Sequence, residues 1–219
     1  MEERGFEYVG SAKDFNMPEF MDCTWQRISC GKFDCKICGK IQKDRMRHLA
    51  RGEDPDDTKN IFEDVGMSLR DTLKMIKRDA EKMGIDIENI KEEDLEEPPG
   101  PEEFPLYKKV EAWHKNASEL VRHAEKSGSA WILTEAAIDL MWYKNTLLVK
   151  TYRQLCTRWD LNKGQEYGEF DFKYTKYVLT KCIKILKKSL KELFASMQLE
   201  EFHILLMELT KLEKQIMSI

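Results

Sequence analysis

The sequence has few of the residues that interrupt helices. Its 219 residues include only 11 glycines and 6 prolines, and three of the prolines are grouped in the segment EEPPGPEE, residues 96–103. We find no segment with the alternation of apolar and polar residues that half-buried strands show. Charged residues reach 35%, a proportion typical of long solvated helices. The sequence therefore predicts an all-α protein.

Long apolar runs are also missing. No stretch approaches the roughly 18 consecutive apolar residues of a membrane-spanning helix. The first ten residues, MEERGFEYVG, are acidic and lack the apolar segment of a secretory signal. We therefore expect no membrane partner and a cytoplasmic location. In that reducing compartment, clustered cysteines are more often metal ligands than disulfides.

Charge is distributed unevenly along the chain, although the net charge is only −4. Residues 27–51 hold eight bases and two acids, a local charge of +6. Residues 52–104 hold seven bases and eighteen acids, a local charge of −11. Residues 105–219 hold nineteen bases and fourteen acids, a local charge of +5. These regional charges guide the choice of partners better than the mean does.

Four of the 6 cysteines are concentrated near the N-terminus, with the spacing C-x6-C-x4-C-x2-C. Four thiolates this close in sequence can surround one tetrahedral ion. The segment CKICGK, residues 35–40, resembles the knuckle of zinc-ribbon proteins; the resemblance covers these six residues and implies a metal site. The predicted ligands are Cys23, Cys30, Cys35 and Cys38.

Zinc is the expected metal, because closed all-cysteine sites are a usual structural form for it. The alternative is an iron–sulfur cluster, since Cys30, Cys35 and Cys38 match the C-x4-C-x2-C run of plant-type ferredoxins. The fourth cysteine here lies upstream and not far downstream. A zinc ion bound by four thiolates has no open position, so it would be structural and not catalytic.

Residues around the cysteines fit this prediction. Glycine follows two of the ligands, and it would let the backbone turn so that amide N–H groups point at sulfur. Four nearby basic residues could offset the net charge of −2 on a divalent ion with four thiolates; they are Arg27, Lys32, Lys36 and Lys40. We expect His48, ten residues after Cys38, to be exposed on a helix and not a ligand.

Between the cysteines and residue 90 we expect a helical arm. Residues 41–49 suit a short basic helix, and a second helix would start at Asp54–Pro55 and break near Gly66. Ser68 with Asp71 would restart it, in the pattern of a capping box. Apolar residues then recur at intervals of four and three along one face; they are Leu69, Leu73, Ile76, Ala80 and Met83.

An acidic, proline-rich segment at 91–104 predicts a linker between two domains. We assign residues 1–90 to the zinc-knuckle module with its helical arm, and residues 105–219 to the second domain. Apolar residues recur at helical spacing over about 105–127, 129–159, 169–196 and 198–217. Helices of this length with short connections predict an up-down four-helix bundle.

Two further candidate sites lie in the bundle. A polar stripe on the second bundle helix could line a groove for a small ligand; its members are Glu135, Asp139, Trp142 and Arg153. Lysines on the third bundle helix could contact phosphates; they are Lys173, Lys176, Lys184, Lys187 and Lys191. For both patterns, an ordinary solvated helix face is the favoured interpretation.

We identify no complete catalytic set in the sequence. The leading hypothesis is therefore a non-enzymatic binding or adaptor protein, in which a structural zinc site helps to dock a protein or nucleic-acid partner. The rival is a redox or electron-transfer protein that uses the same cysteines for an iron–sulfur cluster. A helical enzyme acting through Glu135 and Asp139 is a third hypothesis. The sequence leaves the oligomeric state open.

Overall fold

The computed structural model describes residues 17–84, 86–88, 96–164 and 168–219. Contacts divide the chain into two compact units, one at Pro18–Glu97 and one that runs from Pro98 to Ile219, and each is described by itself. The described residues contain helices and no strand, as an all-α fold requires. Within the same residues, no helix is both long and apolar enough to cross a membrane.

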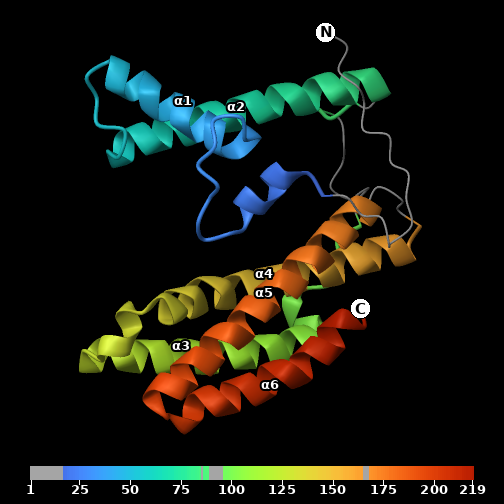
Figure 1. Ribbon diagram of the computed structural model, residues 1–219. Coiled ribbons are helices and arrows are strands. Elements are labelled where there is room, and N and C mark those ends of the chain that lie inside the picture. Colours follow the sequence, from blue (N-terminus) through green and yellow to red (C-terminus); the bar gives the residue numbers. More distant parts are fainter. Residues whose placement is uncertain (1–16, 85, 89–95, 165–167) are drawn as a thin grey trace. The chain divides into compact units, whose positions relative to one another are not determined.

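The second unit is the predicted up-down four-helix bundle (Figure 1). Its helices are α3 (Pro105–Ser127), α4 (Glu135–Asn162), α5 (Gly168–Met197) and α6 (Glu200–Met217). A short 3-10 helix, η3 (Pro101–Glu103), precedes α3, and another, η4 (Ala130–Leu133), connects α3 to α4. Each helix contacts the next, and α6 contacts α3, so the ring is closed.

Side chains between the helices confirm the antiparallel order. Trp113 on α3 is buried, and its Nε1 donates a hydrogen bond to the Leu205 carbonyl of α6 at 2.9 Å. The core consists mainly of leucine and isoleucine at helical spacing. Fully buried members are Leu140, Leu147, Leu179, Ile183, Leu186, Leu190, Leu193, Leu209 and Ile216. Burying side chains of this kind contributes about 1.5–3 kcal/mol each, so this unit has an ample core.

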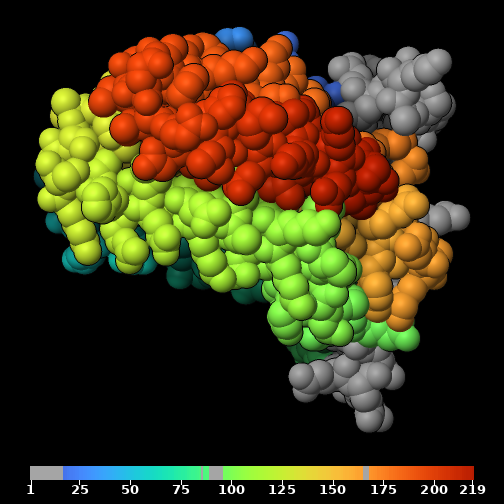
Figure 2. Space-filling view, turned by 90° about the horizontal axis from the view of Figure 1, so that it is seen from below, coloured from blue at the N-terminus to red at the C-terminus, as the bar shows by residue number. Residues whose placement is uncertain are grey.

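The α3–α4 connection differs from the predicted single helix at 129–159. The chain first forms η4, and α4 begins only at Glu135, where the Thr134 side chain accepts a hydrogen bond from Ala137 N–H. Trp131 of η4 is buried edge-on against Phe202 of α6, with ring centroids 5.1 Å apart. Figure 2 shows α6 (red) lying between α3 (green) and α5 (orange) on this face of the bundle.

The first unit holds η1 (Glu19–Thr24), α1 (Lys36–Ala50) and α2 (Thr58–Met83). Helix α1 starts five residues before the predicted position, so it includes Cys38. Helix α2 ends at Met83 and is capped by Gly84, whose φ of 69° gives the left-handed conformation that glycine favours. The domain limits of the sequence analysis stay a prediction, because residues 89–95 lie outside the described part of the chain.

Two local predictions for α2 are wrong. The helix starts at Thr58 because Asp57, and not Asp54, accepts the capping hydrogen bond from Lys59 N–H at 2.8 Å. Nor does the helix break near Gly66. A glycine inside a helix costs about 1 kcal/mol, which a helix of 26 residues tolerates, so α2 runs through it without a restart at Ser68.

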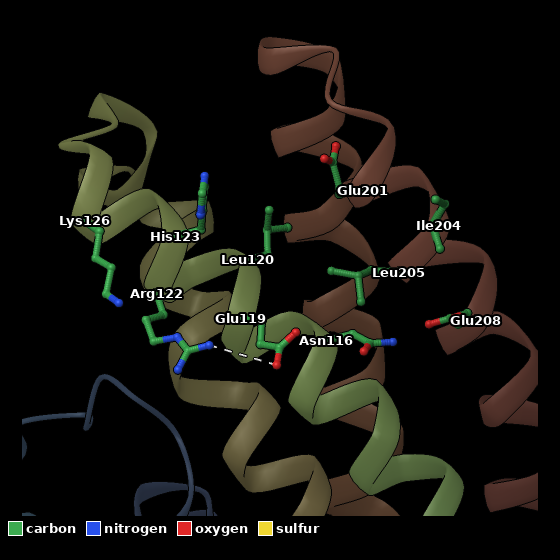
Figure 3. A pocket seen from close by; sticks show the side chains of 10 residues that line it. All are labelled: Asn116, Glu119, Leu120, Arg122, His123, Lys126, Glu201, Ile204, Leu205 and Glu208. Atoms are coloured by element: carbon green, nitrogen blue, oxygen red, sulfur yellow. Dashed lines mark ion pairs between the residues drawn. The ribbon is translucent and has the colours of Figure 1, made fainter.

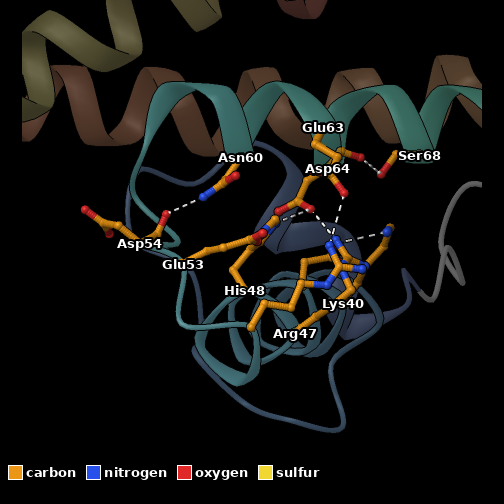
Figure 4. A network of polar contacts seen from close by, with 11 residues as sticks. Lys40, Arg47, His48, Glu53, Asp54, Asn60, Glu63, Asp64 and Ser68 are labelled. Atoms are coloured by element: carbon orange, nitrogen blue, oxygen red, sulfur yellow. Dashed lines mark hydrogen bonds and ion pairs between the residues drawn. The ribbon is translucent and has the colours of Figure 1, made fainter.

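A buried polar cluster joins α1 to α2 (Figure 4). The His48 side chain is fully buried, which corrects the prediction that it is exposed. Its Nδ1 lies 2.6 Å from Glu53 Oε2, and its Nε2 lies 3.0 Å from Asp64 Oδ1. Both neighbours are carboxylates, so both ring nitrogens act as donors and the imidazole carries a positive charge. Arg47 also pairs with Asp64.

Protonation of His48 should therefore stabilise the first unit. Hydrogen bonds to Glu53 and Asp64 raise the pKa of His48 above its usual value, against the opposing effect of burial. The stabilisation is complete below the unfolded pKa of about 6.5 and is lost as pH rises through the higher folded pKa. We expect amides of α1 to exchange faster in His48→Gln than in the wild type at pH 6, with a difference that shrinks towards pH 9.

Hydrogen exchange of α1 peptides measures this difference. The variant and the wild type are compared at the same pH, so the intrinsic exchange rate cancels. His123→Gln is the matched control, because His123 is exposed on α3. A wild-type to His48→Gln difference that stays constant from pH 6 to pH 9 would contradict a charged His48.

Candidate metal centre

The four predicted ligands converge. Their sulfur atoms all lie within 4.8 Å of one another, and the Cys30 and Cys38 sulfurs are 3.6 Å apart. In a tetrahedral site with Zn–S bonds of about 2.3 Å, neighbouring sulfurs are about 3.8 Å apart. The group therefore has the size that a single tetrahedral ion requires.

The four ligands come from different parts of residues 18–50, which we call the wrapped segment. Cys23 lies in η1, Cys30 in the loop that follows, Cys35 at the cap of α1 and Cys38 in its first turn. Trp25 anchors the start of the loop, since its side chain is buried and its Nε1 donates to Asp22 Oδ1 at 3.1 Å. This contact fixes the end of η1, from which the loop leads to the start of α1.

The two glycines that follow ligands have different roles. Gly31 has a φ of 66°, so it makes the turn that the sequence predicts. Gly39 has no such backbone requirement. A Cβ at position 39 would overlap the carbonyl oxygen of Phe33, so the missing side chain lets the loop lie against α1. This close approach brings Cys35 and Cys38 to the same site.

Backbone N–H groups point at the sulfurs. Cys30 N–H donates to the Cys23 sulfur at 3.4 Å. This bond lowers the pKa of Cys23, but burial and the neighbouring thiols outweigh it and raise the pKa to about 12. Burial acts to raise the pKa of Cys38, whereas hydrogen bonds, first from Gly31 N–H, lower it to about 6. Such N–H···S contacts stabilise thiolate ligands.

Several bases of the +6 region pair with acids of the first unit. Arg45 pairs with Asp56 at 2.9 Å, Arg47 pairs with Asp44 at 2.9 Å, and Arg51 pairs with Glu63 at 3.4 Å. Lys40, predicted to offset the thiolates, is directed to Asp44 at 3.1 Å instead. Two of these acids, Asp56 and Glu63, come from the acidic region that follows, so part of the positive charge is taken up within the unit.

A cleft of about 440 Å³ opens beside the sulfurs. Three of the ligands line it, all except Cys38, together with acids, bases and one aromatic ring; these other residues are Glu19, Phe20, Asp22, Gln26, Lys32, Asp34 and Lys36. The Lys36 ammonium stands 5.0 Å from the centre of the Phe20 ring. The cleft therefore offers a hydrophobic spot between charges of both signs. Sequence analysis missed it, because nothing in the sequence shows that η1 faces the start of α1.

The polar stripe proposed as a groove is spread along α4. Glu135 and Arg153 are eighteen positions apart, about 27 Å along a helix, so one small ligand cannot touch both. Arg153 pairs with Asp171 of α5, with Nε 2.8 Å from Oδ2. Asp139 is half-buried, and Trp142 is 47% exposed. The structure therefore does not gather these residues around one point.

The candidate phosphate-binding lysines all lie on α5. Lys173 pairs with Glu169 at 2.5 Å, and Lys187 pairs with Glu213 of α6 at 2.8 Å. The remaining members are Lys176, beside the Phe172 ring, and the exposed Lys184 and Lys191. Phosphate binding by this set stays a prediction.

The bundle has a cavity of about 610 Å³ between α3 and α6 that sequence analysis did not predict (Figure 3). Basic residues Arg122 and Lys126 of α3 line it, opposite the acidic Glu201 and Glu208 of α6. Its floor includes Leu205, which is buried. Charges of both signs face the opening, so the cavity does not select a ligand of one charge.

Comparison of the chain with protein-family models, curated proteins and solved structures finds no match. The four-thiol centre is therefore interpreted from its own geometry.

Replacing Gly39 should damage the metal centre without touching a ligand. In Gly39→Ala the new methyl group must push Phe33 and its loop away, which separates the sulfurs. We expect metal affinity to fall about 10–100-fold, as when contacts around a metal's ligands are lost. Competition with a chromophoric chelator measures the change.

Gly66→Ala is the control, because a Cβ at position 66 of α2 meets no atom within 4 Å. This variant should keep wild-type affinity and be slightly more stable, since alanine favours helix. Equal affinity of Gly39→Ala and the wild type would show that the close approach at Phe33 is unimportant for the site.

Proposed function

We propose that the four cysteines bind one zinc ion as a structural site. The spacing of the sulfurs supports a single ion over an iron–sulfur cluster. The sulfurs lie within 4.8 Å of one another, whereas a cluster places several iron and sulfide atoms inside its ligands and needs them further apart. Four ligands also complete a tetrahedron, so the ion has no open position for a substrate.

On this basis the protein is a non-enzymatic adaptor, and the cleft beside the zinc site docks its partner. The observation that carries this proposal is the placement of the cleft on the wrapped segment itself: Cys23, Cys30 and Cys35 line it together with Phe20. Metal binding would therefore fix the shape of the docking surface, because the same loop supplies ligands and cleft walls.

The charges favour a protein partner over a nucleic acid. Nucleic-acid sites present free basic side chains to phosphates, whereas Arg47 of α1 is engaged by Asp44 at 2.9 Å and by Asp64. Glu19, Asp22 and Asp34 also line the cleft and would repel a phosphate backbone. None of the six cysteines forms a disulfide, and a thiolate site needs reducing conditions, which supports a cytoplasmic location.

Metal content tests the zinc site. We expect one zinc per chain in the purified protein, no visible absorption, and loss of the metal in Cys38→Ser. Cys156→Ser is the control, because Cys156 lies on α4 in the other unit. Elemental analysis with an absorption spectrum gives the answer. Iron with visible absorption would overturn the zinc proposal and favour the redox alternative.

Removal of the metal should unfold part of the first unit and leave the bundle folded. The wrapped segment buries few apolar side chains, so chelation should unfold residues 18–50 while α3–α6 keep their helicity. Hydrogen exchange by peptide, with and without a strong chelator, resolves the two units. Equal loss of protection in the bundle would show that the metal holds the entire chain together.

The docking surface is tested by paired aromatic variants. Phe20 lines the cleft, whereas Phe33 is 66% exposed and lies outside it. We expect a partner protein to cross-link to the wild type in a lysate of the cells that make it. The same cross-link should be absent with Phe20→Asp and present with Phe33→Asp. Loss with both variants, or with neither, would contradict docking at the cleft.

Nucleic-acid binding is tested separately through its salt dependence. Binding of short duplex DNA and single-stranded RNA should be absent, or should show no steep dependence on salt. A logarithmic slope of about −4 or steeper would mean that several phosphates are contacted, and would replace the protein partner by a nucleic acid.

A further inference from the structure

Helix α2 has an exposed apolar stripe. Phe62 is 70% exposed, Leu69 60%, Leu73 58% and Ile76 50%. The contacts of α2 with α1 use other positions, Asp64 among them, and are polar. A row of large apolar side chains left open in this way marks a site of interaction.

The spacing of the stripe indicates what covers it. Phe62, Leu69, Ile76 and Met83 recur every seven residues, and so do Gly66, Leu73 and Ala80. The two sets alternate at intervals of four and three, a period of 3.5 residues. A straight helix has 3.6 residues per turn, so this stripe keeps facing a partner only if that partner is a helix supercoiled with it.

We propose that the partner is a second copy of this chain, and that two α2 helices pair antiparallel. In this arrangement Gly66 faces Ile76 of the second copy, and Leu69 faces Leu73. Each small residue then meets a large one, as close packing requires. A parallel pair would instead place Gly66 against Gly66 and leave a gap.

The ends of the stripe fit the same arrangement. Ala80 is buried, and with Ile87 it lines a hollow of about 370 Å³ at the end of α2. Phe62 of the second copy faces position 80 in the antiparallel register. Its large, exposed ring therefore faces a hollow in which Ala80 and Ile87 are apolar; the other side chains that line it are the charged Lys77, Glu81, Asp86 and Glu88.

Charges beside the stripe also favour the antiparallel pair. Glu63 faces Lys77 of the second copy, and by symmetry this contact occurs twice. In a parallel pair neither residue faces a charge of opposite sign. Within one chain Glu63 pairs with Arg51 at 3.4 Å and Lys77 with Glu88 at 3.2 Å, but exposed pairs of this kind are weak and exchange readily. Arg70 faces Arg70 of the second copy, and this contact is unfavourable because the two charges have the same sign.

Light scattering on the full zinc-loaded chain tests the pairing. We expect a mass of twice 25.9 kDa for the wild type at micromolar concentration. Leu73→Asp should give a monomer with unchanged helicity, because the side chain is exposed within the chain and serves only the pair. A monomeric wild type, or a Leu73→Asp variant that remains a dimer, would overturn the proposal.

Charge exchange tests the orientation. Glu63→Lys or Lys77→Glu alone should weaken the dimer about tenfold, because two attractive contacts become repulsive. The double variant should return to within threefold of the wild type, and Arg70→Gln should bind more tightly than the wild type.

The pairs within one chain cannot explain such a rescue, because the double variant makes both of them repulsive. It places a lysine side chain at position 63 beside Arg51, and a glutamate side chain at position 77 beside Glu88. A dimer that the double variant fails to restore would overturn the antiparallel pairing of α2.

Discussion

The convergence of four sulfur atoms within 4.8 Å is the constraint on which the first unit depends. Between residues 17 and 50, Trp25 and Cys38 are the buried apolar side chains, too few to hold a folded segment. An ion bound by the four thiols would supply what this core lacks, because its binding free energy contributes directly to folding. The bundle, with its row of buried leucines, has no such need. On the proposed zinc site, one chain combines a unit stabilised by metal with a unit stabilised by apolar packing.

Charge pairing is the second constraint, and it changes the view of function. The basic run around the cysteines suggests a phosphate-binding surface when it is read alone. In the structure Arg45 meets Asp56, and Asp64 receives both Arg47 and His48. The contacts of Asp64 attach α1, which carries Cys38, to the long helix α2. The same residues therefore hold α1 against α2 and occupy part of the basic surface that a nucleic acid would seek.

Sequence patterns predicted the features that depend on residues close together in the sequence. Helical spacing predicted the bundle, and the cysteine spacing predicted which four thiols the structure brings together. Some predictions failed because they depend on residues outside the local pattern, whereas the start of α2 and its passage through Gly66 were local errors. His48 becomes buried because Glu53 and Asp64 approach it from two sides, and helical phase alone does not show this. Gly39 is needed because the Phe33 carbonyl lies against it, although the sequence suggested a turn. The cleft and the bundle cavity arise from packing and have no sequence signal.

The central claim is a single zinc ion held by all four thiolates. X-ray absorption at the zinc edge of the purified protein tests it most directly. The account predicts four sulfur neighbours at about 2.3 Å and no nitrogen or oxygen bound to the ion. A zinc ion with fewer sulfur neighbours, or a protein that holds iron and gives no zinc edge, would contradict it.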